Sequence, residues 1–211
     1  EEITIINTKT RNEKIRSFLL KNKKFIIVFI FFLIIMILGF YSYQVYQDKQ
    51  REQFSDKYNS SIIDFRKVDE SQTISSMKEI IQYKDEIYSP LALFFLLDNN
   101  LLNKQKEANN LFNILINETN LDKEIRNLII YKKSLFNADT LKENELLDML
   151  KPITQSDSVW KSHALYLIGE YFYFKNEKKK SKEFFEKIFT IKNANEDIVL
   201  AAQKRLNRDL S

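Results

Sequence analysis

Residues 163–189, HALYLIGEYFYFKNEKKKSKEFFEKIF, carry the spacing that decides the fold. Small residues stand at Gly169 and, twelve positions later, at Ser181, and Phe185 follows four residues after that. A polar stretch over 175–180 separates two segments whose apolar residues recur at helical spacing. Two antiparallel helices approach closely only where side chains are small, and a large side chain then fills the groove beside the crossing. The stretch therefore predicts a pair of closely packed helices.

A weaker copy of this spacing lies earlier in the chain. Ala108 takes the place of Ser181, Phe112 follows it by four residues, and Leu96 precedes it by twelve. The two copies are about two repeats apart, with one further helix pair of no clear signature between them, over 122–151. The spacing is that of tetratricopeptide repeats and predicts an α-solenoid of stacked helix pairs. The alternative is an ordinary antiparallel helical bundle, in which packing alone produces the same spacings.

The composition of the 211 residues favours an all-α fold and argues against catalysis. Two glycines and two prolines are too few for a fold with many tight turns, and no segment alternates with the period of a strand. The absence of cysteine excludes disulfides, cysteine-ligated zinc, iron–sulfur clusters and cysteine nucleophiles, and there is one histidine. Glycine-rich phosphate loops and the common hydrolase motifs are also absent. We therefore expect no enzymatic activity, no catalytic residue, no cofactor and no bound metal.

Apolar periodicity and capping residues predict a series of helices from residue 47 onward. They cover 47–68, 71–87, 89–102, 104–116, 122–136, 140–151, 159–174, 180–190 and 195–210. We expect Ser89 and Thr140 to be N-caps, because short polar side chains there precede apolar segments. Either Ser156 or Asp157 is expected to cap the next helix along, and Pro152 to end the one before it.

An apolar segment at residues 25–46 precedes this body. Its core, FIIVFIFFLIIMILGFY at 25–41, is apolar or aromatic except for Gly39. The uncharged stretch reaches roughly 35 Å as a helix, enough to cross a hydrocarbon core of about 30 Å, and tyrosines follow it as in an aromatic belt. A buried core helix and a cleaved signal peptide are the alternatives, but bulky residues stand where a cleavage site needs small ones. We expect an uncleaved single-pass transmembrane helix.

The charges around this segment predict its orientation. Seven Lys and Arg residues lie within residues 1–24, against three in the first residues after the span. By the positive-inside rule, 1–24 form a basic cytoplasmic tail and 47–211 a helical domain across the membrane. The net charge of +4 belongs to the tail, so the body is neutral overall. A nucleic-acid partner is therefore not expected.

The tetratricopeptide register predicts which residues face the concave side of the stack. They are His163, Tyr166, Glu170 and Tyr173, and the register set by Ala108 adds Leu93 and Leu97. Tyrosines beside a histidine and a carboxylate suit a partner-binding surface, because aromatic residues are enriched where proteins bind. The alternative is that Tyr166 and Tyr173 are core residues whose hydroxyls reach the edge.

Three segments together resemble a known bacterial family. They are KIRSFLLKNKKFIIVFIFFLIIMILGFYSYQVYQ at 14–47, the stretch at 163–189, and AAQKRLNRDL at 201–210. They resemble the tetratricopeptide-like family typified by YfgM, the ancillary subunit of the SecYEG translocon, although this chain is poorer in Ala and Gly. The resemblance implies a membrane-anchored repeat scaffold in the bacterial inner membrane, with its helical domain in the periplasm. It also implies SecYEG and a membrane-anchored periplasmic chaperone as partners.

A structural role is the rival interpretation. The body would then self-associate and space or oligomerise membrane partners during envelope assembly or cell division. An apolar stripe of Phe54, Tyr58, Ile62 and Phe65 would form a coiled-coil seam, although it covers only about two heptads. The oligomeric state and the identity of any client stay open at this point.

Overall fold

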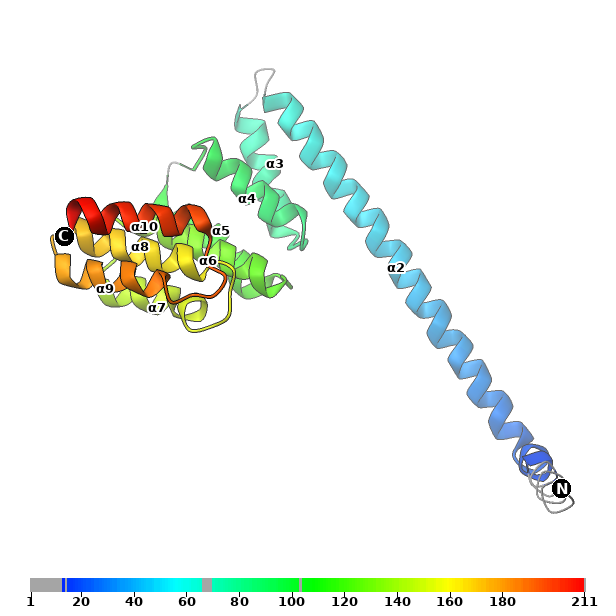
Figure 1. Cartoon of the computed structure of the whole chain (residues 1–211). Helices are drawn as coiled ribbons and strands as arrows, with labels where there is room; N and C mark the ends of the chain where they lie inside the picture. The colour runs from blue at the N-terminus through cyan, green and yellow to red at the C-terminus, as the bar shows by residue number, and fades with distance from the viewer. Residues whose placement is uncertain (1–12, 14, 66–69, 103, 211) are drawn as a thin grey trace, which may run out of the picture. The chain divides into compact units, whose positions relative to one another are not determined.

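The computed structural model describes residues 13, 15–65, 70–102 and 104–210 (Figure 1). The described residues form helices joined by turns, bends and irregular segments, and they include no strand. The all-α prediction is therefore confirmed. The chain divides into two compact units, Glu1–Gln53 and Phe54–Ser211.

The first unit consists mainly of the long helix α2, Lys23–Phe65, whose last part belongs to the second unit. By length and composition α2 is able to cross a membrane, and no residue in its most apolar window is buried. Large side chains such as Phe29, Phe32 and Leu38 are exposed along it. A buried core helix therefore does not describe this apolar segment.

The second unit is built from the end of α2 and the shorter helices that follow it. They are α3 (Glu70–Gln82), α4 (Tyr88–Asp98), α5 (Gln105–Asn113), the π-helical turn η1 (Ile114–Glu118), α6 (Lys123–Asn137), α7 (Glu143–Thr154), α8 (Lys161–Phe174), α9 (Lys178–Ile188) and α10 (Glu196–Asp209). Helix α8 packs on α9, and α7 packs on both α6 and α8. Helix α10 covers α8 and α9, while α3 packs on α4 (Figure 1). Neighbours in sequence are thus neighbours in space, as in a helical repeat.

The core of the second unit is a series of three apolar clusters. The first joins the end of α2 to α3, α4, α5 and η1, with Met77, Leu96 and Phe112 fully buried. The second lies between α6, α7 and α8, and the third between α8, α9 and α10. A core that passes from one helix pair to the next is typical of stacked repeats, in which each unit contacts only its neighbours.

The apolar stripe at the end of α2 packs inside the second unit. The ring centroids of Phe54 and Tyr58 lie 4.7 and 6.0 Å from those of Tyr83 and Tyr88. The other two stripe residues pack against the first cluster as well. The surface required for a coiled-coil seam is therefore already used within the chain.

The start of α4 corrects the expected role of Ser89. The carboxylate of Asp85 accepts hydrogen bonds from the amides of Ile87 and Tyr88, at 2.9 and 2.7 Å, and so caps the helix. Ser89 is buried one residue inside α4, and its hydroxyl donates to the Ile80 carbonyl at 2.7 Å. The serine therefore ties α4 to α3, because a buried hydroxyl needs a partner.

Pro152 does not end its helix, since α7 continues to Thr154. A proline in a helix removes one hydrogen bond and its ring crowds the carbonyl four residues earlier, but only Ile153 and Thr154 of α7 follow Pro152. The next turn remains bonded, with the Gln155 amide donating to the Lys151 carbonyl at 3.0 Å. The proline is therefore tolerated at this position.

The structure also corrects the expected caps of α7 and α8, namely Thr140, Ser156 and Asp157. At the start of α7, the Lys142 amide donates to the Glu145 carboxylate at 2.8 Å. Before α8, the Ser158 hydroxyl accepts from the Trp160 amide at 3.2 Å. Both helices begin a few residues later than the sequence predicts, because these contacts satisfy the first free amides.

Candidate functional site

The structure brings together the three residues whose spacing predicts the last helix pair. The Ser181 hydroxyl donates a hydrogen bond of 2.9 Å to the Gly169 carbonyl, so α9 crosses α8 at this point. The Phe185 ring covers Gly169, and a Cβ added to the glycine would lie 2.6 Å from it. All three residues are buried. The close approach follows directly from the absence of a side chain at Gly169.

The earlier copy of the spacing is arranged differently. Leu96 and Phe112 share the first cluster, and Ala108 is buried. However, α4 packs mainly on α3 and makes few contacts with α5, so the expected α4–α5 pair does not form. The sequence of α4, YSPLALFFLLD, is apolar on almost every face, and this allows it to bury itself against α3 instead.

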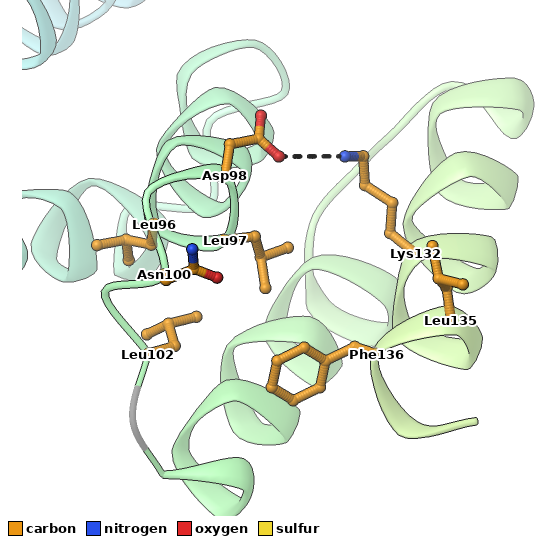
Figure 2. A pocket seen from close by; sticks show the side chains of 8 residues that line it. All are labelled: Leu96, Leu97, Asp98, Asn100, Leu102, Lys132, Leu135 and Phe136. Carbon is orange, nitrogen blue, oxygen red and sulfur yellow. Dashed lines mark ion pairs between the residues drawn. The ribbon is translucent and has the colours of Figure 1, made fainter. Parts of the chain in front are cut away.

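A hollow of about 500 Å³ lies between α4 and α6 (Figure 2). It is lined by Leu96, Leu97, Asp98, Asn100, Leu102, Lys132, Leu135 and Phe136. Figure 2 shows Leu97, Leu102 and Phe136 at the space between the helices, while Asp98 and Lys132 face each other across its edge. The Lys132 ammonium lies 3.7 Å from the Asp98 carboxylate and 4.7 Å from the centroid of the Phe94 ring. The hollow is therefore an apolar pocket with a charged rim.

A second hollow, of about 330 Å³, lies between α6 and α8. It is lined by Leu135, Ala138, Asp139, Leu167, Glu170, Tyr171, Phe174 and Lys175. Because Leu135 lines both hollows, they are adjacent and together run across α4, α6 and α8. We call the two hollows together the α4–α6–α8 groove.

Large apolar side chains are exposed in this groove. Leu135, Phe136 and Phe174 expose 52%, 38% and 80% of their surface. A contiguous exposed apolar surface with a polar rim is typical of protein-binding and ligand-binding sites. The groove is therefore the candidate binding site of the second unit.

Two of the predicted partner-binding residues line this groove, and a third does not. Leu97 lines the first hollow and Glu170 the second. Leu93 is fully buried in the first cluster, so the structure corrects its expected place on a partner-facing surface. The physical reason is that Leu93 lies on the face of α4 that packs within the first cluster.

Tyr166, Glu170 and Tyr173 of α8 contact α9 or α10 of the same chain, so Glu170 both borders the second hollow and pairs with α10. Both carboxylate oxygens of Glu170 accept hydrogen bonds of 2.6 Å from the Arg205 guanidinium. These bonds raise the pKa of Arg205 above its ordinary value. The guanidinium lies 4.8 Å from the centroid of the Tyr173 ring, and Tyr166 packs on Phe185 at a centroid distance of 5.3 Å.

Tyr166 and Tyr173 therefore fit the alternative in which they are core residues and not partner-binding residues. Tyr166 and Tyr173 both pack against the third cluster, between α8, α9 and α10. Burial, with a further contribution from the Glu170 charge, raises the pKa of the Tyr166 hydroxyl. The expected open face of α8 is covered at this position by the last helix of the chain.

His163 lies in an aromatic cluster at the start of α8. Its ring centroid is 5.8 Å from that of Tyr131 and 5.2 Å from that of Trp160. The side chain is half-buried, and its buried Nδ1 atom has no hydrogen-bond partner among the described residues. Burial lowers the pKa of His163, so the neutral imidazole is favoured.

The main residues of the groove were not predicted from the sequence. Lys132, Leu135 and Phe136 come from α6, which lies in the segment without a repeat signature. One signal was available: Leu135 follows Ile129 and Ile130 by six and five residues, so on a helix it lies away from the face that these two residues share. A second signal was Phe174. Tyr171 and Phe172 already supply the buried aromatic side chains at this end of α8, and Phe174 is a further aromatic residue beyond them.

Metal binding finds no support in the described part of the chain. Within those residues, no three His, Asp or Glu side chains lie close enough together to hold a metal ion. The chemistry available in the groove is therefore apolar contact, hydrogen bonding and ion pairing.

Comparison with known protein families shows which family the chain belongs to. The tetratricopeptide repeat-like domain family matches residues 16–207, which is most of the chain. The chain belongs to this family. The match covers both the apolar part of α2 and the helical body that follows it. No curated protein and no solved structure matches the chain.

Membership of the tetratricopeptide repeat-like domain family agrees with the packing of α8 on α9 and of α6 on α7. Such stacks bind proteins through the curved surface that their own packing leaves open. In this domain the α4–α6–α8 groove is a surface that the packing of the helices leaves open. Helix α4 packs on α3, and the first hollow of the groove lies between α4 and α6.

Proposed function

We propose that this protein is a non-enzymatic, membrane-anchored scaffold whose helical body binds other proteins through the α4–α6–α8 groove. The observation that carries the proposal is the exposed apolar lining of this groove in a tetratricopeptide repeat-like domain. Apolar pockets with a few polar groups at the rim bury a partner's side chains and orient them. Leu135, which lines both hollows, is at the centre of the proposed contact.

The anchor in this proposal is the apolar part of α2. Its side chains are exposed to solvent in the isolated chain, which would be strongly unfavourable in water for so long a stretch. In a bilayer these side chains would contact lipid acyl chains, and their unfavourable exposure to water would be avoided. The seven basic residues ahead of the span favour a cytoplasmic N-terminus and a periplasmic body in a bacterial inner membrane.

The partners proposed are the SecYEG translocon and a membrane-anchored periplasmic chaperone. Their support is the sequence resemblance to the YfgM-like family, in the basic and apolar opening, the last helix pair and the closing helix. A repeat domain held at the membrane surface would meet exported chains and their chaperones as they leave the translocon. The absence of cysteine and the single histidine support a binding role over catalysis.

Self-association is the competing outcome, and the structure gives it less support. The stripe that would form its coiled-coil seam contacts Tyr83 and Tyr88 within the same chain. A dimer would therefore have to use a different surface. Size-exclusion chromatography with light scattering on the detergent-solubilised full chain distinguishes a monomer from a self-associating assembly.

Site-specific photocrosslinking tests the binding proposal. A photoreactive amino acid replaces Leu135 in the groove, and a control places it at Leu200 on α10, where 57% of the leucine is exposed. In inner membranes we expect crosslinks to translocon or chaperone subunits from position 135 and not from position 200. Equal crosslinking from both positions would contradict the groove. Crosslinks from position 135 to other proteins alone would contradict the partners.

A further inference from the structure

A further hollow lies in the first unit, at the start of the apolar part of α2. A hollow of about 460 Å³ is lined by Leu20, Lys21, Asn22, Lys23, Lys24 and Phe25. We call these six residues the basic cradle. None of them belongs to the α4–α6–α8 groove, and their chemistry is different.

Among the described residues, the positive charge of the basic cradle has no ion-pair partner. Lys21, Lys23 and Lys24 are exposed and form no ion pair within the described residues. Arg16 adds a fourth cation nearby in the sequence, and no Asp or Glu occurs between residues 15 and 47. Several ammonium groups so close together repel one another, and an anion at this place would relieve the repulsion.

The walls of the cradle are apolar. Leu20 and Phe25 expose 66% and 74% of their surface on either side of the lysines. A soluble anion or a nucleic-acid backbone would use only the ammonium groups and leave these side chains in water. A molecule with an anionic head and an apolar body would satisfy both kinds of surface.

The cradle is joined to the apolar helix by continuous hydrogen bonding. The Asn22 amide donates to the Phe18 carbonyl and the Ile26 amide donates to the Asn22 carbonyl, each at 3.0 Å. The Asn22 side chain also donates to the Phe18 carbonyl, at 3.1 Å. The lysines are therefore fixed to the end of the apolar segment, at the level where a spanning helix meets the headgroups.

We propose that the basic cradle binds the headgroups of anionic phospholipids in the leaflet at the N-terminal end of α2. The inference rests on the membrane anchoring in the proposed function. The phosphates lie among the three ammonium groups, while Leu20 and Phe25 contact the glycerol and upper acyl region. Anionic lipid attracts juxtamembrane lysines strongly, and the attraction falls with salt.

The test uses the full chain reconstituted in phosphatidylcholine vesicles that contain a trace of spin-labelled lipid. Electron paramagnetic resonance measures how strongly the protein immobilises labelled phosphatidylglycerol relative to labelled phosphatidylcholine. We expect a preference for phosphatidylglycerol that falls roughly fivefold for each lysine removed. The triple variant Lys21→Gln, Lys23→Gln, Lys24→Gln should therefore lose the preference.

The matched control is Lys178→Gln, Lys179→Gln, Lys182→Gln, which removes the same charge from exposed positions of α9. It should keep the preference. An equal loss in both variants, or no preference in the unaltered chain, would overturn the inference. Flotation with phosphatidylcholine vesicles separates the two proposals: a chain that floats without headgroup preference contradicts only the cradle. A chain that does not float contradicts the anchor and the cradle together.

Discussion

The ring of Phe185 lies so close to Gly169 that a Cβ added to the glycine would be 2.6 Å from the ring's Cε1 atom. Two further ring atoms would lie 2.8 and 2.9 Å away. Since Phe185 is fully buried, the ring has little room to move aside. The contact between α8 and α9 therefore depends on glycine at position 169.

Gly169→Leu should destabilise the second unit. Overpacking of a filled core costs about 1–3 kcal/mol, whereas replacing glycine by leucine at an exposed helical position stabilises by up to about 1 kcal/mol. A urea melt of residues 54–211, followed by circular dichroism, measures the difference. Phe185→Leu is the matched second change, because a smaller side chain should reduce the penalty in the double variant. A stabilised Gly169→Leu variant would contradict the observed packing.

The last helix pair could be predicted from the sequence because its evidence is local. Gly169, Ser181 and Phe185 carry a spacing that only a close helix crossing requires, and the structure brings them together. The extent of the apolar segment in α2 was equally readable, since length and hydropathy depend on neighbouring residues alone. Such features do not depend on how distant parts of the chain are arranged.

The groove could not be predicted in the same way. It exists because α4 packs on α3 instead of α5, and the nearly uniform apolarity of α4 does not say which face is buried. Likewise, Tyr166 and Tyr173 occupy the expected face of α8, but both pack in the third cluster, and Arg205 of α10 lies over the Tyr173 ring. Which helix α4 or α8 packs against depends on the whole stack, so it cannot be predicted from the sequence of that helix alone.

Tyr166→Ala and Phe174→Ala should separate core residues from groove residues. Tyr166 packs on Phe185 in the third cluster and is partly buried, so its truncation should cost about 3 kcal/mol of unfolding free energy, the lower end of the range for a buried aromatic side chain. Phe174 is 80% exposed, so Phe174→Ala should change stability by less than about 0.5 kcal/mol. Urea melts measure both values. A near-neutral Tyr166→Ala variant would instead restore Tyr166 as a candidate partner-binding residue.

His163 should make the second unit less stable as the pH falls. Burial lowers its folded-state pKa below the ordinary value of about 6.5, so below that pH the unfolded chain binds more protons. Stability is therefore lost as the pH falls from about 6.5 towards the folded pKa, with a slope below about 1.4 kcal/mol per pH unit. Urea melts between neutral and mildly acidic pH should show this slope, and His163→Gln should flatten it.

Trp160 provides an independent measurement of the same titration. It is the only tryptophan in the chain, and its ring lies 5.2 Å from that of His163. A protonated imidazole so close should quench its fluorescence, with a midpoint below about 6.5 in the folded protein. An unchanged titration in His163→Gln, or a midpoint above the ordinary value, would show that burial does not control this histidine.

The orientation of the chain can be tested with single cysteines, because the sequence has none of its own. Asn207→Cys lies on the exposed face of α10, and Ser17→Cys lies in the helical residues ahead of α2. The excess of basic residues before the span predicts that the region of Ser17 stays in the cytoplasm. In intact spheroplasts a membrane-impermeant thiol reagent should therefore label position 207 and spare position 17, and detergent should make both reactive. Labelling of position 17 alone would reverse the orientation and place the groove on the cytoplasmic side, where a periplasmic chaperone could not reach it.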